Sequence, residues 1–378
     1  MERKLITGNQ AAALAARDSG VEVVAAYPIT PSTPVVEEIA RMVESGEMDA
    51  RLILVESEHS AMAACIGASA SGSRVFTATS SHGLAYMHEL LHYAANARTP
   101  VVMAVANRAI GPGWNIWADL GDTMSQRDTG WIQFYCSNNQ EIYDTVVMAY
   151  RVAEDRRVLL PAMVCYDGFV LSHTAMPVVT GIGKFLEEYR APWKMDFDEP
   201  ETFGNILSSD YYMELRKDIF ESHIRAIKVI KKTEEAFESL TGRHTPLLLE
   251  KYMLDDAEVA IVAIGAIASE SKIAVKRLRR EGKKVGLLRI RCFRPFPSTD
   301  VVEALEGVDT AVVVDRSISP GHEGQLFSEI KSALYNSRKR PEILGKVAGL
   351  GGRDVTFRAI EKAVCGGFRD GWITEVVV

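Results

Sequence analysis

The sequence predicts an α/β protein made of two α/β domains that are joined by a linker. In two regions of the 378-residue chain, short apolar runs that suit buried strands alternate with patterns that suit helices. With 47% hydrophobic residues, the chain is long enough to bury more than one core. Between the two regions the alternation weakens, prolines interrupt it, and a long amphipathic pattern follows. We therefore expect one domain over residues 1–170, a linker with a long helix over 171–250, and a second domain over 251–378.

The first region supplies helices and strands in a regular order. Thr7 is placed to cap a helix from Asn9 to Arg17, which Gly20 ends. Strands are expected at 21–27, 51–56, 74–81, 100–107, 133–137 and 160–166, and further helices at 34–46, 58–71, 84–96 and 139–155. The run 100–107 is almost continuously apolar, as in a parallel sheet that is covered on both faces, and the short strand 51–56 is also expected to be buried.

The second region repeats the alternation after an amphipathic helix expected at 210–240. Strands are expected at 258–265, 284–290 and 310–315, and helices at 269–281, 299–306 and 324–334. The turn Gly265-Ala-Ile-Ala-Ser-Glu270 has one glycine, so the GxGxxG fingerprint of dinucleotide binding is absent. The chain contains neither a GxxxxGK[ST] phosphate loop nor an HExxH zinc motif.

The charge balance and hydropathy limit the kinds of partner. A net charge of -7 without a dense basic stripe argues against a general nucleic-acid binder. The basic cluster 276–284 falls on a predicted surface helix, where solvated charge is the usual explanation. No apolar run approaches the roughly 18 residues of a membrane span, and the start Met-Glu-Arg-Lys leads into a helix of small residues and not into a signal peptide. We expect a cytoplasmic protein that binds neither nucleic acid nor a membrane.

The five cysteines are far apart in the sequence and form no CxxC pair. They are Cys65, Cys136, Cys165, Cys292 and Cys365. This spacing offers no ligand set for a metal ion or an iron-sulfur cluster, so we expect reduced and mostly buried thiols.

Polar residues follow the predicted strands at their carboxyl ends, which is the edge where open α/β sheets bind ligands. Ser57 is placed to cap the helix that follows strand 51–56, which puts Glu58 in the first turn. A carboxylate there is stabilised by free backbone N–H groups, and this is also the ordinary structural reason for a glutamate at that position. Thr30 lies on a proline-rich loop, and Arg108 follows strand 100–107. From the residues alone, Arg108 is better explained as a surface ion-pair residue.

Four ordered motifs together resemble the alpha subunit of the 2-oxoacid:ferredoxin oxidoreductases, in the multisubunit anaerobic and archaeal form of the pyruvate:ferredoxin oxidoreductase type. The motifs are Tyr27-Pro-Ile-Thr-Pro-Ser-Thr-Pro34, Glu56-Ser-Glu-His-Ser-Ala61, Asn115-Ile-Trp117 with Arg127-Asp-Thr-Gly-Trp-Ile-Gln133, and Arg294-Pro-Phe-Pro297. The resemblance covers nearly the whole chain. It implies that residues 1–170 form the pyrimidine-side domain of a thiamin diphosphate enzyme and that 251–378 form a transketolase C-terminal-like domain.

The resemblance also gives Glu58 a chemical role. In such enzymes a buried carboxyl group hydrogen-bonds the aminopyrimidine ring of the cofactor and so assists its activation. Glu56 is the alternative carboxylate, and the family pattern Ser-Glu-His favours Glu58. His59 is expected to be a packing or hydrogen-bonding neighbour.

Other residues match family positions around the substrate and the cofactor. The resemblance implies that Thr30 and Arg108 hold the substrate carboxylate, and a guanidinium fork that binds a carboxylate in two places suits this role. The residues expected beside the cofactor, in addition to Glu58, are Pro28, Ile29, Ser81 and His82.

The resemblance further implies that the chain is one part of a larger enzyme. The diphosphate-and-metal signature of thiamin enzymes, GDG followed some 30 residues later by Asn-Asn, is absent, because Gly121-Asp-Thr and Asn138-Asn139 are too close together and the second glycine is missing. A beta subunit is therefore expected to hold the diphosphate and Mg²⁺, and gamma and ferredoxin-like delta subunits are expected to complete the enzyme. Fe-S clusters on the partner subunits would pass electrons to ferredoxin as a 2-oxoacid and CoA become acyl-CoA and CO2.

The substrate is expected to be pyruvate, with alternatives left open. The chain has Ser81-His82-Gly83 where relatives carry Ser-Gln-Gly or Ala-Gln-Gly, and its loop Ile110-Gly-Pro-Gly-Trp114 also departs from the pyruvate-type pattern. These differences leave a branched-chain or aryl 2-oxoacid as an alternative, and NAD as an alternative electron acceptor. A non-catalytic Rossmann-type nucleotide-binding partner subunit is the alternative from a different class.

Overall fold

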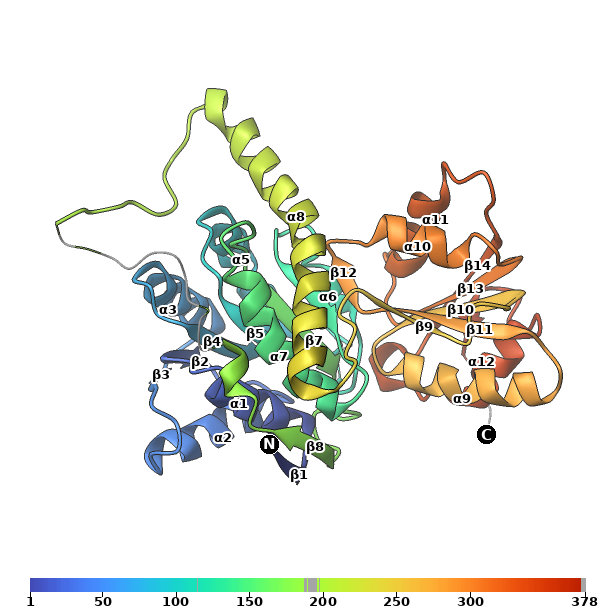
Figure 1. Cartoon of the computed structure of the whole chain (residues 1–378), viewed down its shortest axis with the longest axis horizontal. Coiled ribbons are helices and arrows are strands. Elements are labelled where there is room, and N and C mark those ends of the chain that lie inside the picture. The colour runs from blue at the N-terminus through green and yellow to red at the C-terminus, as the bar shows by residue number, and fades with distance from the viewer. Residues whose placement is uncertain (114, 187–188, 190–195, 197, 375–378) are drawn as a thin grey trace.

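The computed structural model describes residues 1–113, 115–186, 189, 196 and 198–374. They form two α/β units that lie side by side, with the long helix α8 (Ser209–Thr241) packed on the first unit (Figure 1). The α/β fold class predicted from the sequence is confirmed, as is the long helix expected at 210–240.

A seven-stranded sheet of order β12-β6-β7-β5-β4-β2-β3 forms the centre of the first unit. All neighbouring strands are parallel except β12 and β6, which are antiparallel. The strands are β2 (Val23–Ala26), β3 (Arg51–Leu54), β4 (Val75–Thr79), β5 (Val102–Asn107), β6 (Ile132–Tyr135), β7 (Ala162–Asp167) and β12 (Cys292–Arg294). The helices are α1 (Gly8–Asp18), α2 (Thr33–Glu44), α3 (Glu58–Ala70), α4 (Ser81–Tyr86), α5 (His88–Asn96), α6 (Gly121–Met124) and α7 (Asn139–Ala153).

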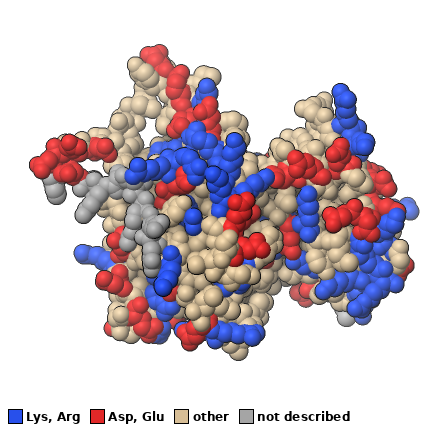
Figure 2. Space-filling view, viewed as in Figure 1, with Lys and Arg blue, Asp and Glu red and all other residues tan. Residues whose placement is uncertain are grey.

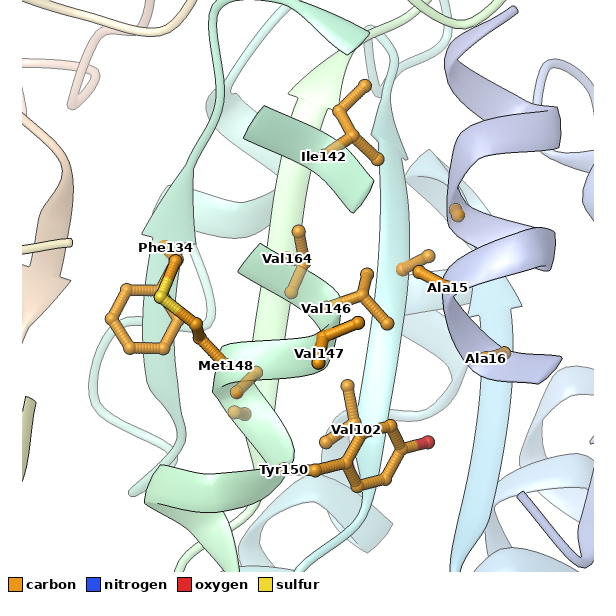
Figure 3. Packing of buried hydrophobic residues seen from close by; sticks show 14 of the residues in the cluster. Ala15, Ala16, Val102, Phe134, Ile142, Val146, Val147, Met148, Tyr150 and Val164 are labelled. Carbon is orange, nitrogen blue, oxygen red and sulfur yellow. The ribbon is translucent and has the colours of Figure 1, made fainter. Parts of the chain in front are cut away.

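Helices cover both faces of this sheet. On one face, α1, α2 and α7 bury a core with β2, β4, β5, β6 and β7. Figure 3 shows the centre of this layer, where Val146 of α7 lies beside Ala15 of α1 and Met148 lies beside Phe134 of β6. The fully buried alanines of α1 let the two helices approach closely, because a methyl side chain fills little space. On the other face, α3, α4 and α5 pack against the sheet.

The order of the strands creates a switch point in the first sheet. The chain passes from β2 to β3 at one edge and then returns to the other side of β2 to form β4. Because successive connections leave β2 in opposite directions, a crevice is expected at the carboxyl ends of β2 and β4. The loops that follow β2, β3, β4 and β5 all begin at this edge.

Several local expectations require correction. The strand expected to be buried at 51–56 is instead the edge strand β3, and its Leu54 is 64% exposed, because an edge strand is covered on one side only. The helix expected at 84–96 is divided at Met87 into α4 and α5. A two-stranded antiparallel sheet of β1 (Glu2–Ile6) and β8 (Met176–Thr180) was not expected, because these strands carry few buried residues to mark them.

A six-stranded sheet of order β15-β14-β13-β10-β11-β9 forms the second unit, and its pairs are parallel except β9 with β11. The strands are β9 (Leu249–Tyr252), β10 (Val259–Ile264), β11 (Val285–Ile290), β13 (Thr310–Asp315), β14 (Glu342–Ala348) and β15 (Trp372–Ile373). The helices are α9 (Ile267–Arg280), α10 (Ser298–Leu305), α11 (Gln325–Leu334) and α12 (Phe357–Val364), with short 3-10 turns at Gly183–Leu186 and Leu350–Gly352. The basic cluster of α9 lies on the outer surface of this unit, as Figure 2 shows, and pairs there with Asp256 and Glu361.

Strand β12 connects the two units. It belongs to the second half of the sequence but pairs with β6 at the edge of the first sheet. Two of the sequence motifs consequently meet, since the Arg294 side chain lies 3.9 Å from Asp128 and donates to Glu329 at 2.5 Å. A buried ion pair between Asp167 of β7 and Arg316 also joins the units.

Candidate active site at the carboxyl ends of the parallel strands

Glu58 is the first residue of α3 and lies at the switch-point edge of the first sheet. Ser57 caps this helix, as the sequence predicts, with its hydroxyl accepting from the Ser60 N–H at 3.2 Å. The Glu58 side chain is only 7% exposed. It faces Gly83 of α4, where an added Cβ atom would lie 2.5 Å from Glu58 Oε1 and 2.6 Å from Thr79 Oγ1. The carboxylate is therefore enclosed between two helices and the end of β4.

The neighbouring glutamate has a different environment. Glu56 is exposed, and the hydroxyl of Ser60 donates to its carboxylate, which lowers the pKa of Glu56. His59 is half-buried, with its Nε2 atom 3.7 Å from Glu89 and its ring 5.8 Å from that of Tyr86. Of the two glutamates considered from the sequence, Glu58 is the one in a setting suited to a buried acid-base group.

Arg108 brings three of the sequence-predicted site residues together. It follows β5, and its side chain is 5% exposed. Its Nη1 donates to the backbone oxygen of Thr30 at 2.6 Å, and its Nη2 lies 2.9 Å from Nδ1 of His82. Burial lowers the pKa of the guanidinium, while the negative charges of Asp122 and Glu58 oppose that effect. The surface ion pair expected from the residues alone is replaced by a buried network.

Ser81 and Asp122 fix the connection between β4 and α4. Ser81 has a φ of 46°, in the left-handed region that is uncommon for residues with a side chain. Its backbone N–H donates to Asp122 at 3.0 Å, and its hydroxyl donates to the Ala109 oxygen at 2.6 Å. These two bonds hold the strained residue and tie α4 to the loop after β5.

The sequence alone does not mark Asp122 as a site residue. It is fully buried and accepts from the side chain of Asn107 and from the backbone N–H groups of Ser81, Arg108 and Thr123, at 2.7 to 3.0 Å. Burial raises the pKa of Asp122 to about 7, against the lowering effect of these hydrogen bonds. In the sequence, its place in the long irregular segment 109–130 indicates a functional role. That segment also contains other polar residues, and the sequence does not show which of them belongs to the site.

The loop that follows β2 lies against Arg108. Pro28 and Thr30 on this loop are exposed, and Ile29 is half-buried. The Ile29 oxygen accepts from the N–H groups of Ser32 and Thr33 at 2.9 and 3.1 Å, which closes a turn into α2. This turn presents the Thr30 carbonyl to Arg108.

The end of β4 carries buried hydroxyl groups. Within the described part of the chain, Thr79 Oγ1 and Ser80 Oγ at this end have no hydrogen-bond partner, and neither has Thr77 Oγ1 in the middle of the strand. Buried polar atoms are seldom left without partners, so such atoms at a sheet edge favour a bound polar group. Thr79 is the hydroxyl nearest to the point where Glu58 meets Gly83.

The segment 115–119 is held by the second unit. Asn115 donates to the Gly351 oxygen at 2.9 Å, and the Gly351 N–H donates to Asp119 at 3.0 Å. Gly352 donates to the Ala118 oxygen at 2.7 Å. The motif Asn115-Ile-Trp117 is therefore fixed between the two units, while Trp114 of the preceding loop lies outside the described residues.

The described ranges contain neither a metal-binding cluster nor a helix that could span a membrane. No group of three or more His, Cys, Asp or Glu side chains there is arranged to hold a metal ion. Cys65, Cys136, Cys165 and Cys292 are buried and Cys365 is exposed, all as free thiols. None of the described helices is both long and apolar enough to cross a membrane.

Comparisons with known proteins agree with the fold and identify the family of the chain. Residues 14–235 match the family model described as pyruvate flavodoxin/ferredoxin oxidoreductase, thiamine diP-binding, and residues 257–360 match pyruvate:ferredoxin oxidoreductase core domain II. The chain is 49% identical to ketoisovalerate oxidoreductase subunit VorA of Pyrococcus furiosus over 95% of this chain and 92% of that protein. It is 46% identical to pyruvate synthase subunit PorA of Methanocaldococcus jannaschii over 96% of this chain and 94% of that protein.

Two solved structures share the fold. One is the 2-oxoglutarate:ferredoxin oxidoreductase from Magnetococcus marinus, with a TM-score of 0.73 and 20% identity over 96% of this chain and 65% of that chain. The other is the beta4 tetramer of a split-gene transketolase, with a TM-score of 0.57 and 14% identity over 97% of this chain and 100% of that chain. At these identities the likeness concerns the fold alone.

Proposed function

This chain belongs to the pyruvate flavodoxin/ferredoxin oxidoreductase family, and we propose that it is the alpha subunit of a multisubunit enzyme that oxidatively decarboxylates a 2-oxoacid. The observation that carries the proposal is the buried Glu58 carboxylate, enclosed by Gly83 and lying at the same sheet edge as the buried guanidinium of Arg108. These two groups supply an acid-base function and a carboxylate-binding function next to each other.

Thiamin diphosphate fits the residues at this edge. No described residue donates a hydrogen bond to the Glu58 carboxylate, and the buried hydroxyls of Thr79 and Ser80 also have no partner among the described residues. We assign Glu58 to the hydrogen bond with the aminopyrimidine ring, at which its carboxyl group holds or releases a proton. When bound, the cofactor supplies the carbon nucleophile and the electron sink for decarboxylation.

Residues on two neighbouring loops complete the proposed cofactor surface. Pro28 and Ile29 offer apolar atoms from the loop after β2, and Ser81 and His82 lie at the start of α4. The hydrogen bonds of Ser81 to Asp122 and Ala109 keep this surface in place, because they hold the first turn of α4 against the loop after β5.

Arg108 and Thr30 are proposed to bind the carboxylate of the substrate. A guanidinium carries a permanent charge and planar N–H donors that suit a carboxylate. Its bond to the Thr30 carbonyl brings the Thr30 hydroxyl into the same neighbourhood, where it can donate a further bond. Low water access around Arg108 strengthens the attraction to an anionic substrate.

Further subunits are proposed to complete the enzyme. The relatives are named as subunits of ketoisovalerate oxidoreductase and of pyruvate synthase, and the sequence lacks the GDG…Asn-Asn signature. We assign the diphosphate and Mg²⁺ to a beta subunit and the Fe-S clusters to partner subunits, including gamma and ferredoxin-like delta subunits. CoA then accepts the acyl group, and ferredoxin accepts the electrons, with NAD as the alternative acceptor.

Two substrate classes are supported by named relatives. Pyruvate is proposed first, in agreement with the pyruvate synthase subunits. A branched-chain 2-oxoacid is the second candidate, because the ketoisovalerate oxidoreductase subunits are 47 to 49% identical to this chain and the pyruvate synthase subunit of Methanocaldococcus jannaschii is 46% identical. The family match to oxidoreductase subunits sets aside the alternative of a non-catalytic nucleotide-binding partner.

The test is an assay of the natively purified complex with a panel of 2-oxoacids, CoA and either ferredoxin or NAD. We expect CoA-dependent CO2 release that requires thiamin diphosphate and is abolished by Glu58→Gln. A complex that releases no CO2 from any 2-oxoacid, although it contains thiamin diphosphate and iron, would contradict the proposal.

A further inference from the structure

We propose that His82 is a positioning residue that fixes the substrate-binding guanidinium of Arg108 and the glycine-containing loop 110–113 as one unit. This inference rests on the proposed function, because Arg108 matters here as the group that holds a 2-oxoacid. The directed hydrogen bonds of one imidazole ring orient that guanidinium group.

The two nitrogen atoms of His82 contact two different elements. Nδ1 lies 2.9 Å from Nη2 of Arg108, which follows β5, and Nε2 lies 2.8 Å from the backbone oxygen of Gly111 on the following loop. His82 itself is the second residue of α4 and is half-buried. The ring therefore spans the space between the guanidinium and the loop.

The chemistry of these contacts fixes the tautomer of the ring. A guanidinium only donates hydrogen bonds, so Nδ1 of His82 must accept and carries no proton. The proton of the neutral ring is then on Nε2, which donates to the Gly111 oxygen. The longer approach of the Gly111 N–H to Nε2, at 3.4 Å, cannot be a hydrogen bond in that tautomer because Nε2 has no free lone pair.

Arg108 is consequently held from two sides. Thr30 accepts from Nη1 at 2.6 Å on the side of the β2 loop, and His82 accepts from Nη2 on the side of α4. Two bonds from different elements define the plane of the guanidinium, and a bidentate contact with a carboxylate depends on that plane. The charged groups that face this pair are Glu58 and Asp122, whose negative charges act on Arg108.

The same ring also anchors the loop. Gly111 and Gly113 give this loop little side-chain packing, and Gly113 has a φ of 79°. The bond from His82 to the Gly111 oxygen ties this loop to α4, and the Ser81 hydroxyl donates at 2.6 Å to the oxygen of Ala109, the residue before the loop. Loss of the imidazole would therefore release both the loop and one side of the guanidinium, which weakens binding of the 2-oxoacid more than the chemical step.

The experiment compares His82→Ala, His82→Asn and His82→Gln in the assembled complex. The matched control is His244→Ala, because His244 is exposed and pairs only with Glu238 among the described residues. For each variant, KM and kcat for the 2-oxoacid and the content of thiamin diphosphate are measured.

In the fraction that holds thiamin diphosphate, we expect His82→Ala to raise KM about tenfold and to reduce kcat less than threefold. Glutamine offers one acceptor and one donor, so His82→Gln should restore most of the lost affinity. Asparagine is too short to reach both partners, so His82→Asn should raise KM as His82→Ala does. If the alanine variant does not assemble, the KM of His82→Asn tests the inference in its place.

An unchanged KM in His82→Ala or His82→Asn would overturn the inference, and so would a loss of thiamin diphosphate with KM preserved in the loaded fraction. Failure of the proposed function gives a different result, because the wild-type complex would then release no CO2 from any 2-oxoacid.

Discussion

Gly83 and Glu58 are in such close contact that no side chain fits between them. A Cβ atom at Gly83 would lie 2.5 Å from Oε1 and 2.8 Å from Cγ of Glu58. Real Cβ atoms do not approach other atoms so closely, and protein interiors do not compress to absorb such an overlap. The Glu58 carboxylate can therefore occupy its place only because residue 83 of α4 has no side chain.

Gly83→Ala is expected to displace the Glu58 carboxylate. The added methyl group would also meet Thr79 Oγ1 at 2.6 Å, so the side chain of Glu58 has to move. A displacement of about 1 Å at a catalytic group lowers the rate by about 100-fold. The measurement is kcat for CO2 release by the assembled complex. The control is Gly67→Ala in α3, where the added methyl group meets nothing within 4 Å and should stabilise the helix by about 0.5 to 1 kcal/mol. Equal activity of the two variants would contradict this role of Gly83.

Glu58→Gln is expected to leave the complex assembled and to lower decarboxylation by about 100-fold or more. The amide keeps the size of the side chain but cannot exchange a proton at neutral pH. Glu56→Gln is the matched comparison, since Glu56 is exposed and bonded to Ser60, and it should retain activity. CO2 release and thiamin diphosphate content are measured for both. The opposite pattern, with activity lost only in Glu56→Gln, would assign the reaction to the other carboxylate.

Arg108→Lys is expected to keep the positive charge but lose the planar fork that binds a carboxylate. We expect kcat/KM for the 2-oxoacid to fall about 100-fold, mostly through KM, with thiamin diphosphate content unchanged. Steady-state kinetics and cofactor analysis of the same preparation separate these effects. If the variant loses the cofactor instead, Arg108 has a structural role in the cofactor site.

Glu141→Gln is expected to destabilise the protein by about 3 kcal/mol. Glu141 of α7 accepts from Arg289 at 2.5 and 2.8 Å and lies 3.7 Å from Arg291, and both arginines are almost completely buried. The substitution removes the negative charge that the guanidinium groups of Arg289 and Arg291 contact. Thermal unfolding of the variant measures the loss. The control is Glu47→Gln, which breaks an exposed pair with Arg41 and should give no measurable change.

The contacts of Glu141 with Arg289 and Arg291 also make the stability of the protein depend on pH. Burial raises the pKa of Glu141, but Arg291 and Arg289 lower it further, so the net pKa in the folded protein lies well below the ordinary value. A depressed pKa contributes stability that is present above the unfolded value, about 4.3, and is lost as the pH falls below it. Unfolding measured from pH 7 to pH 3 should therefore show a steeper acid loss in the wild type than in Glu141→Gln. Parallel pH profiles of stability for the wild type and Glu141→Gln would contradict the lowered pKa of Glu141.

The parts of the fold that carry local signals were predictable from the sequence. Thr7 caps α1 and Ser57 caps α3 as their positions indicate, and the periodicity of 210–240 predicts α8. Strand β12 had no such signal, because three residues are too few for a pattern and its partner β6 is distant in the sequence. The exposure of β3 also depends on its place at the sheet edge, which its apolar residues do not encode.

The candidate site was predictable as a set of residues but not as a network. The ends of predicted strands place Glu58, Thr30 and Arg108 at one edge, because parallel strands share their carboxyl ends. The bond from Arg108 to the Thr30 carbonyl and the contact with His82 depend on how three loops fold over that edge. The same holds for Asp122, whose four donors come from three segments of the chain, the start of α4, the end of β5 and α6 itself.

The pairing of β12 with β6 has a consequence for fragments of this protein. A fragment that ends before Cys292 would leave the N–H and C=O groups along the free side of β6 without partners. Such an open border invites pairing with further copies of the same chain, which is a common start of aggregation. Strand β12, from the second half of the sequence, thus covers an edge of the sheet that the first half forms. We therefore expect that a cut between the two family domains would not give two self-sufficient pieces.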